Sequence, residues 1–265
     1  MTWEQLADGY GLIEGPTIDR DGALLFSDVP NGGVYRLDAD RQVEEVVPKR
    51  RGVGGIALHA DGGMVLSGRN VCHVLDGETR VILDRESDQM AFNDLACDAA
   101  GRVYVGTLIG YGDRHEHRPG HLLRVELDRS VTTLYGNVRL TNGIGFSPAG
   151  GTLYHSDTRA KALIVHDLAG DGSPENRRLF THDDDFAPDG LAVSVDGGIW
   201  VACAGAGRVV HFDPAGRVID EVDAPTAAVT SVCFDGDTLH AVTMDGLVLR
   251  RPGVAEGTPV HPARV

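Results

Sequence analysis

The sequence predicts an all-β fold, a six-bladed β-propeller with four-stranded antiparallel blades, on three observations. A unit of similar sequence recurs six times along the 265 residues, and each unit holds up to four short β runs separated by turn residues. No long segment shows the 3.6-residue period of an amphipathic helix. A repeat of about 40 to 50 residues with four strands is the signature of a propeller blade. The whole chain, residues 1–265, is predicted to form one such domain.

The six units are aligned on a pair of small or polar residues that precedes the first apolar run. The first residues of these pairs are Glu14, Gly54, Asn93, Asn142, Asp189 and Thr230. They are 40, 39, 49, 47 and 41 residues apart. A sandwich or a barrel, the rival all-β folds, does not explain self-similarity with this period.

Each unit begins with two β runs around a turn rich in Asp, Gly and Ala. In order, these hairpins read IEGPTIDRDGALLFSD (13–28), VGGIALHADGGMVLSG (53–68), FNDLACDAAGRVYVGT (92–107), TNGIGFSPAGGTLYHSD (141–157), FAPDGLAVSVDGGIWVA (186–202) and TSVCFDGDTLHAVT (230–243). A third alternating run follows, such as GRVVHFD at 207–213, and most units have a fourth, such as RVIDEVD at 217–223. The pattern predicts four strands per blade.

The last unit is short, because only 36 residues run from Thr230 to Val265. It lacks room for an outer strand. We therefore expect the N-terminal segment before Glu14 to supply that strand and to close the ring, since an open ring would leave strand edges unpaired.

Composition limits the function classes. The formal net charge of −15 argues against nucleic acid or an anionic membrane as partner, because both require a basic patch. The four cysteines are widely spaced within apolar runs, which predicts buried free thiols. The N-terminus lacks the pattern of a signal peptide, and no stretch approaches 18 apolar residues, so a cytoplasmic protein is expected.

The repeat places polar residues in a ring. In a propeller the first strand of each blade lines the central channel, so matched positions lie at one height around the axis. Four of the six matched residues carry oxygen: Glu14, Asn93, Asn142 and Asp189. Two carboxylates and two carboxamides suit a hard divalent cation such as Ca²⁺, Mg²⁺ or Mn²⁺. Taken singly, the Asn and Asp residues also fit turns, but Glu has no such preference.

Several of these segments resemble the gluconolactonase family, which includes regucalcin. They are LIEGPTID, FNDLACDAAGRVYVGT, LTNGIGFSPAGGTLYHSD and APDGLAVSVDGGIWVACAGAGRVVHFDPAG. The resemblance implies a six-bladed propeller that holds one divalent cation, Ca²⁺ first and Mg²⁺, Mn²⁺ or Zn²⁺ as alternatives, and that hydrolyses sugar lactones. It implies Glu14, Asn142 and Asp189 as metal ligands. Asn93 matches an asparagine that contacts metal or substrate, and Asp189 matches the family's candidate general base.

The sequence departs from the family pattern at one position. Sugar-lactonase members typically have an arginine two residues before Asn93, and here that residue is Ala91. The loss of a guanidinium removes a multi-donor partner for sugar hydroxyls. A longer insertion at 108–123 offers Tyr111, Arg114 and His115 as substrate contacts, or else forms a solvated loop.

The sequence thus indicates a metal-dependent hydrolase that opens a cyclic ester of a small molecule by attack of water. Two alternatives stay open. One is a hydrolase of the same scaffold that acts on a phosphotriester or a non-sugar lactone, which the Ala91 departure favours. The other is a non-enzymatic propeller that binds calcium or a protein. The oligomeric state is not indicated.

Overall fold

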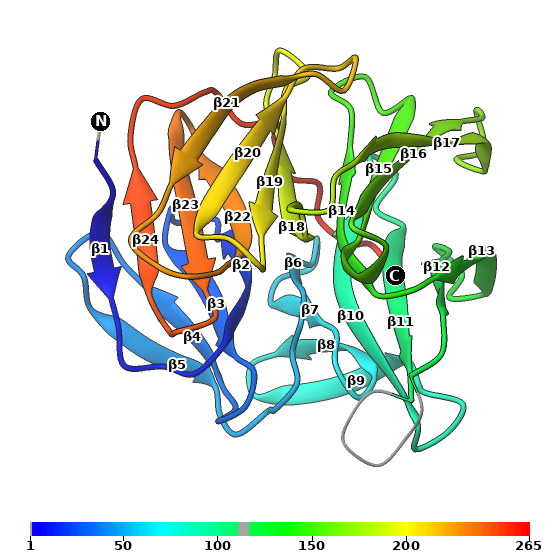
Figure 1. Ribbon diagram of the computed structural model, residues 1–265. Coiled ribbons are helices and arrows are strands. Elements are labelled where there is room, and N and C mark those ends of the chain that lie inside the picture. The colour runs from blue at the N-terminus through cyan, green and yellow to red at the C-terminus, as the bar shows by residue number, and fades with distance from the viewer. Residues whose placement is uncertain (1, 111–116) are drawn as a thin grey trace.

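Six four-stranded antiparallel sheets make up the fold (Figure 1), which confirms the predicted propeller. The computed structural model describes residues 2–110 and 117–265. Blade 1 contains β2 (Ile13–Ile18), β3 (Leu24–Asp28), β4 (Val34–Leu37) and β5 (Val43–Val47). Blade 2 contains β6 (Ile56–Leu58), β7 (Met64–Leu66), β8 (Val71–Leu75) and β9 (Glu78–Leu83). Blade 3 contains β10 (Met90–Cys97), β11 (Val103–Ile109), β12 (Gly120–Val125) and β13 (Val131–Val138).

The second half of the chain repeats this order. Blade 4 contains β14 (Thr141–Phe146), β15 (Thr152–Asp157), β16 (Ala162–Leu168) and β17 (Pro174–His182), with the 3-10 helix η1 (Thr158–Ala160) after β15. Blade 5 contains β18 (Pro188–Val193), β19 (Ile199–Cys203), β20 (Arg208–Phe212) and β21 (Val218–Asp223). Blade 6 contains β22 (Val229–Asp235), β23 (Thr238–Thr243), β24 (Val248–Arg251) and, as its fourth strand, β1 (Glu4–Ala7).

The N-terminal strand closes the ring as the short last unit predicts. Strand β1 pairs antiparallel with β24 (Figure 1). Glu4 lies opposite Arg250 in this pair. Arg250 Nε also donates to Glu4 Oε2 at 2.7 Å. This pairing leaves blade 6 with four strands although its own repeat supplies three, so the two ends of the chain hold the circle together.

The hydrophobic core is divided among the blade interfaces. Six clusters of buried side chains occur, and each joins one pair of neighbouring blades. The cluster between blades 6 and 1 combines Ile13 and Phe26 with Val242 and Val248, so the closing interface is packed like the others. Outer strands are mostly exposed, as in β9 and β17. The inner strands are therefore fixed on both sides, which gives the channel rigid walls.

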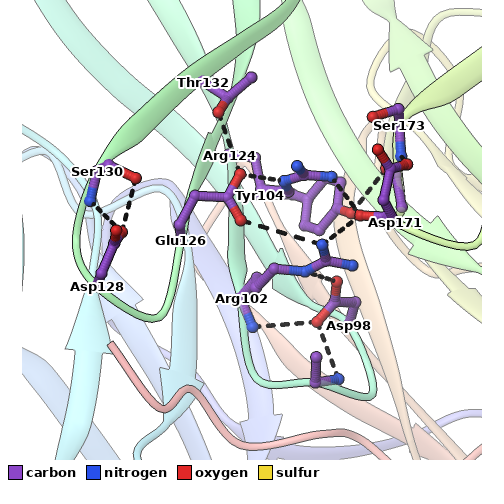
Figure 2. A network of polar contacts seen from close by, with 12 residues as sticks. Asp98, Arg102, Tyr104, Arg124, Glu126, Asp128, Ser130, Thr132, Asp171 and Ser173 are labelled. Carbon is purple, nitrogen blue, oxygen red and sulfur yellow. Dashed lines mark hydrogen bonds and ion pairs between the residues drawn. The ribbon is translucent and has the colours of Figure 1, made fainter.

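A polar network adds to the apolar contact between blades 3 and 4 (Figure 2). Arg102 Nε donates to Asp98 at 2.6 Å, and Arg124 Nε donates to Glu126 at 2.6 Å. Both guanidinium groups also donate to the main-chain carbonyl of Asp171, which lies between β16 and β17. Arg124 is buried, so these contacts satisfy a charge that would otherwise be costly to enclose.

The segment after β24 crosses the propeller face at which each inner strand ends. Thr258 N donates to the carbonyl of Val193 in blade 5 at 2.9 Å. Further along, Ala263 N donates to the carbonyl of Leu58 in blade 2 at 2.8 Å. This segment therefore spans the channel from one side to the other.

Candidate functional site

The matched residues lie inside the inner strands, at β-bulges. The sequence predicts them just before the strands, and that placement is wrong for every blade except blade 2, where Gly54 precedes β6. The strand register shifts between Glu14 and Thr17, between Phe92 and Leu95, between Thr141 and Ile144, between Pro188 and Leu191, and between Val229 and Ser231. A bulge places two residues opposite one and re-aims their side chains. The same irregularity thus recurs at the same height in five blades.

Neighbouring inner strands approach one another closely at this height. A Cβ atom on Gly190 would lie 1.9 Å from Oγ of Ser231 in blade 6. A Cβ atom on Gly143 would lie 2.4 Å from the main-chain oxygen of Asp189. Glycine is therefore required at positions 143 and 190, because a side chain there would push the neighbouring strands apart. This approach brings the polar residues of adjacent blades together.

Two carboxyl groups of the ring are buried, and one oxygen of each has no hydrogen-bond donor among the residues that the structure describes. Glu14 is 7% exposed and Asp189 is 4% exposed. Glu14 Oε2 and Asp189 Oδ1 have no hydrogen-bond partner within the described residues. Burial raises the pKa of Glu14 well above its ordinary value, and repulsion from Asp189 and Asp94 adds to the rise. Burial and repulsion from Asp94 raise the pKa of Asp189 in the same way. A bound cation would relieve both the burial and the repulsion.

The two carboxamides are oriented by blade 4. Asn93 Nδ2 donates to the Thr141 carbonyl at 2.9 Å and to Asn142 Oδ1 at 3.1 Å. Asn142 Nδ2 donates to Thr158 Oγ1 at 3.0 Å. The Thr158 hydroxyl in turn donates to the main-chain carbonyl of Pro188, the residue before Asp189, at 2.7 Å. Thr158 therefore connects the ring residues of blades 4 and 5, and it fixes Asn142 Oδ1 as the acceptor that faces Asn93.

Asp94 is a third acid at this height, and the sequence reasoning did not single it out. It is the second residue of the blade 3 pair, where four of the other five blades have Gly15, Gly55, Gly143 and Gly190. Burial raises the pKa of Asp94 to about 7. The sequence signal for Asp94 is that a carboxylate stands where four matched blades have glycine. Glycine is typical there because the neighbouring strands approach closely.

The donor set fits a hard cation by its chemistry. Within the described part of the chain, no three side chains of the His, Cys, Asp and Glu types lie close enough together to hold a metal ion. A ring site thus depends on two carboxylates and on amide oxygens, which Ca²⁺ and Mg²⁺ accept and Zn²⁺ accepts less readily. The orphaned oxygens of Glu14 and Asp189 are the observation that supports the fit.

The predicted substrate contacts fall largely outside the structure's coverage. Tyr111, Arg114 and His115 lie outside the described residues, which resume at His117. Ala91 lies in β10 opposite Leu108 and is half-buried. It carries no polar group, so this position of β10 offers no side-chain hydrogen bond.

The cysteines are free and buried, as the sequence predicts: Cys72, Cys97, Cys203 and Cys233. Burial raises the pKa of the Cys97 thiol to about 12, so it stays protonated at neutral pH. Within residues 2–110 and 117–265 no helix is long and apolar enough to cross a bilayer.

Comparison with known proteins adds to this geometry. The family model described as SMP-30/gluconolactonase/LRE-like region matches residues 12–244. A 6-deoxy-6-sulfogluconolactonase of Pseudomonas putida is 32% identical over 231 residues, which cover 84% of this chain and 78% of that protein. Pentonolactonase XacC of Haloferax volcanii is 30% identical over 244 residues, covering 89% and 82% of the two chains. The solved calcium-binding protein regucalcin of Agrobacterium tumefaciens superposes with a TM-score of 0.86 at 22% identity, covering 98% of this chain and 96% of that one.

Proposed function

The chain belongs to the SMP-30/gluconolactonase/LRE-like family. From this premise we propose that it is a lactonase, which opens a cyclic ester with water at the ring formed by Glu14, Asn93, Asn142 and Asp189. The observation that carries the proposal is that the buried carboxyl groups of Glu14 and Asp189 each keep one oxygen, Oε2 and Oδ1, without a hydrogen-bond partner among the described residues. The names of two relatives, a sulfogluconolactonase and a pentonolactonase, support the reaction class.

We assign one divalent cation to Glu14, Asn142 and Asp189, with Asn93 beside them. Bound there, the cation supplies Lewis-acid polarisation of the ester carbonyl and charge stabilisation for the oxyanion. Asn93 holds Asn142 Oδ1 through its own Nδ2, and this contact orients the amide oxygen. Two carboxylates balance the charge of one divalent ion, and Ca²⁺ agrees with the description of the regucalcin structure as calcium-binding.

Asp189 is the residue to which we assign the proton transfer. Its Oδ1 accepts no hydrogen bond from the described residues, so no protein donor competes with a proton for this oxygen. Asp94 is the second carboxyl that could take this proton, because it lies close enough to repel Glu14 and Asp189. A substitution of Asp189 by Asn separates the two roles, because it leaves Asp94 unchanged.

The hydroxyl of Thr158 is predicted to set the cation affinity without touching the ion. In Thr158→Val the side chain keeps its shape but no longer accepts from Asn142, so the amide is free to rotate. We expect Ca²⁺ affinity, measured by titration calorimetry on metal-stripped protein, to fall about 10- to 100-fold. Thr158→Ser keeps the hydroxyl and is expected to bind within about threefold of the native protein. Equal affinities in the two variants would show that Thr158 does not position Asn142.

The substrate is expected to depend less on sugar hydroxyls than in relatives that carry an arginine at the Ala91 position. A panel of sugar lactones, aliphatic lactones and one phosphotriester, assayed with Ca²⁺, Mn²⁺ and Zn²⁺, tests the proposed function. We expect lactone hydrolysis, with Ala91→Arg raising kcat/KM for sugar lactones relative to aliphatic ones. Turnover of the phosphotriester alone would favour the second hydrolase reading. Tight Ca²⁺ binding without any turnover would favour the non-enzymatic propeller.

A further inference from the structure

A cavity of about 380 Å³ lies along the propeller axis, separate from the ring. Residues of all six inner strands line it, including Ile56, Leu95, Ile144, Leu191 and Val232. None of the four predicted ring residues contributes to the lining. The cavity therefore reaches the ring layer from the face where the inner strands end, and its wall is mainly apolar.

The mouth of this cavity carries exposed apolar side chains. Val195, in the turn between β18 and β19, is 50% exposed, and Val260 in the crossing segment is 65% exposed. Both line the cavity, as does Pro259 beside Val260 in the crossing segment. The rim thus extends the apolar surface of the interior to the outside, which is a feature of ligand entrances.

The inner end of the cavity holds one ionisable side chain, that of Asp94, together with the hydroxyl of Ser231 at the matched position of blade 6. Asp94 lines the cavity and is 7% exposed, and no hydrogen bond to its carboxyl group occurs within residues 2–110 and 117–265. Unlike Glu14 Oε2 and Asp189 Oδ1, its oxygens are not fully enclosed by protein, so the carboxyl group borders open space. A buried acceptor without a donor is destabilising, and a donor group on a ligand would satisfy it.

We propose that this cavity is a second binding site, which takes a compact apolar molecule carrying one hydrogen-bond donor, an alcohol or an amine. The apolar body contacts the inner strands, and the donor group reaches Asp94. The volume lies in the range of small-molecule sites. The ligand enters from the face opposite the ring, so it does not have to displace the cation that we assign to Glu14, Asn142 and Asp189.

The fluorescent amine N-phenyl-1-naphthylamine is the probe for this site, because it is apolar and has one N–H donor. Titration into the full-length protein is expected to give saturable fluorescence enhancement at one site, unchanged by EDTA. Cyclohexylmethanol and methylcyclohexane then compete with the probe. The native protein is expected to prefer the alcohol. The affinity for cyclohexylmethanol divided by the affinity for methylcyclohexane is expected to fall about tenfold when Asp94→Leu removes the acceptor. Asp220→Leu, at an exposed position of β21, is the matched control and should leave the ratio unchanged.

A second pair of variants tests the mouth without altering the interior. Val195→Asp places a charge on the rim and is expected to weaken probe binding at least fivefold, with lactone hydrolysis and thermal unfolding unchanged. Val218→Asp, on β21 and 53% exposed, is its control. The proposal is overturned if the native protein gives no saturable enhancement, or if Asp94→Leu and Val195→Asp bind the probe and both competitors as the native protein does. Loss of lactonase activity on cation removal with probe binding retained supports it, because the two sites then fail separately.

Discussion

Asp189→Asn is expected to lower kcat/KM for lactone hydrolysis about a thousandfold when the assay holds enough cation to keep the weakened site filled. The amide keeps an oxygen that a cation accepts, but it does not take a proton from water at neutral pH. General base catalysis contributes about 10² to 10⁴ in rate, which sets the expected size. Metal content by mass spectrometry and kinetics on the same sample make the measurement.

The control for this variant is Asp189→Ala, which removes both the base and the ligand. It is expected to lose activity and most of the cation together. Asp189→Asn with full activity and full metal content would show that Asp189 is not the base, and Asp94 would then be the carboxyl group to substitute next. Full activity in Asp189→Ala would rule out both roles.

Glu14→Gln is expected to weaken cation binding about a hundredfold and, at the same time, to stabilise the metal-free protein. The first effect follows from removing one of two charged ligands. The second follows because Glu14 is buried with an oxygen that has no partner. Removing its charge is expected to raise the free energy of unfolding by about 1 to 3 kcal/mol at pH 8.

The stability of the metal-free protein is expected to depend on pH through the buried carboxyl groups. Glu14, Asp94 and Asp189 all have a raised pKa in the fold, Asp94 to about 7. The folded protein then holds protons that the unfolded chain releases near pH 4. The stability that these three groups contribute is therefore greatest below that pH and is lost as pH rises through their folded-state pKa values. The melting temperature of the metal-free protein should fall between pH 5 and pH 8, and fall less in Glu14→Gln. A melting temperature that rises between pH 5 and pH 8 would contradict the raised pKa values. An equally steep fall in Glu14→Gln and in the native protein would contradict the part assigned to Glu14.

The repeat was enough to predict the propeller and its closure, because both follow from sequence period and strand count. Matching the six units also brought Glu14 and Asp189, 175 residues apart, to one height. What the repeat could not show is that both residues occupy bulges, since a bulge depends on the register of the neighbouring strand.

Three further features depend on contacts that sequence spacing does not encode. Thr158 joins the ring only because η1 folds back toward Pro188. Asp94 reads as part of an ordinary Asn-Asp turn pair until the glycines at its matched positions are seen to touch neighbouring strands. The apolar cavity depends on how the segment around Val260 crosses the channel, which no local pattern predicts.

The most direct test of the account is lactone hydrolysis by metal-stripped protein during titration with Ca²⁺ or Mn²⁺. The account predicts negligible activity in the stripped protein, a rise with added cation that saturates at one ion per chain, and no rise in Glu14→Gln at the same concentration. Undiminished hydrolysis in protein that holds less than about 0.1 equivalent of metal would contradict a cation-dependent site at the ring.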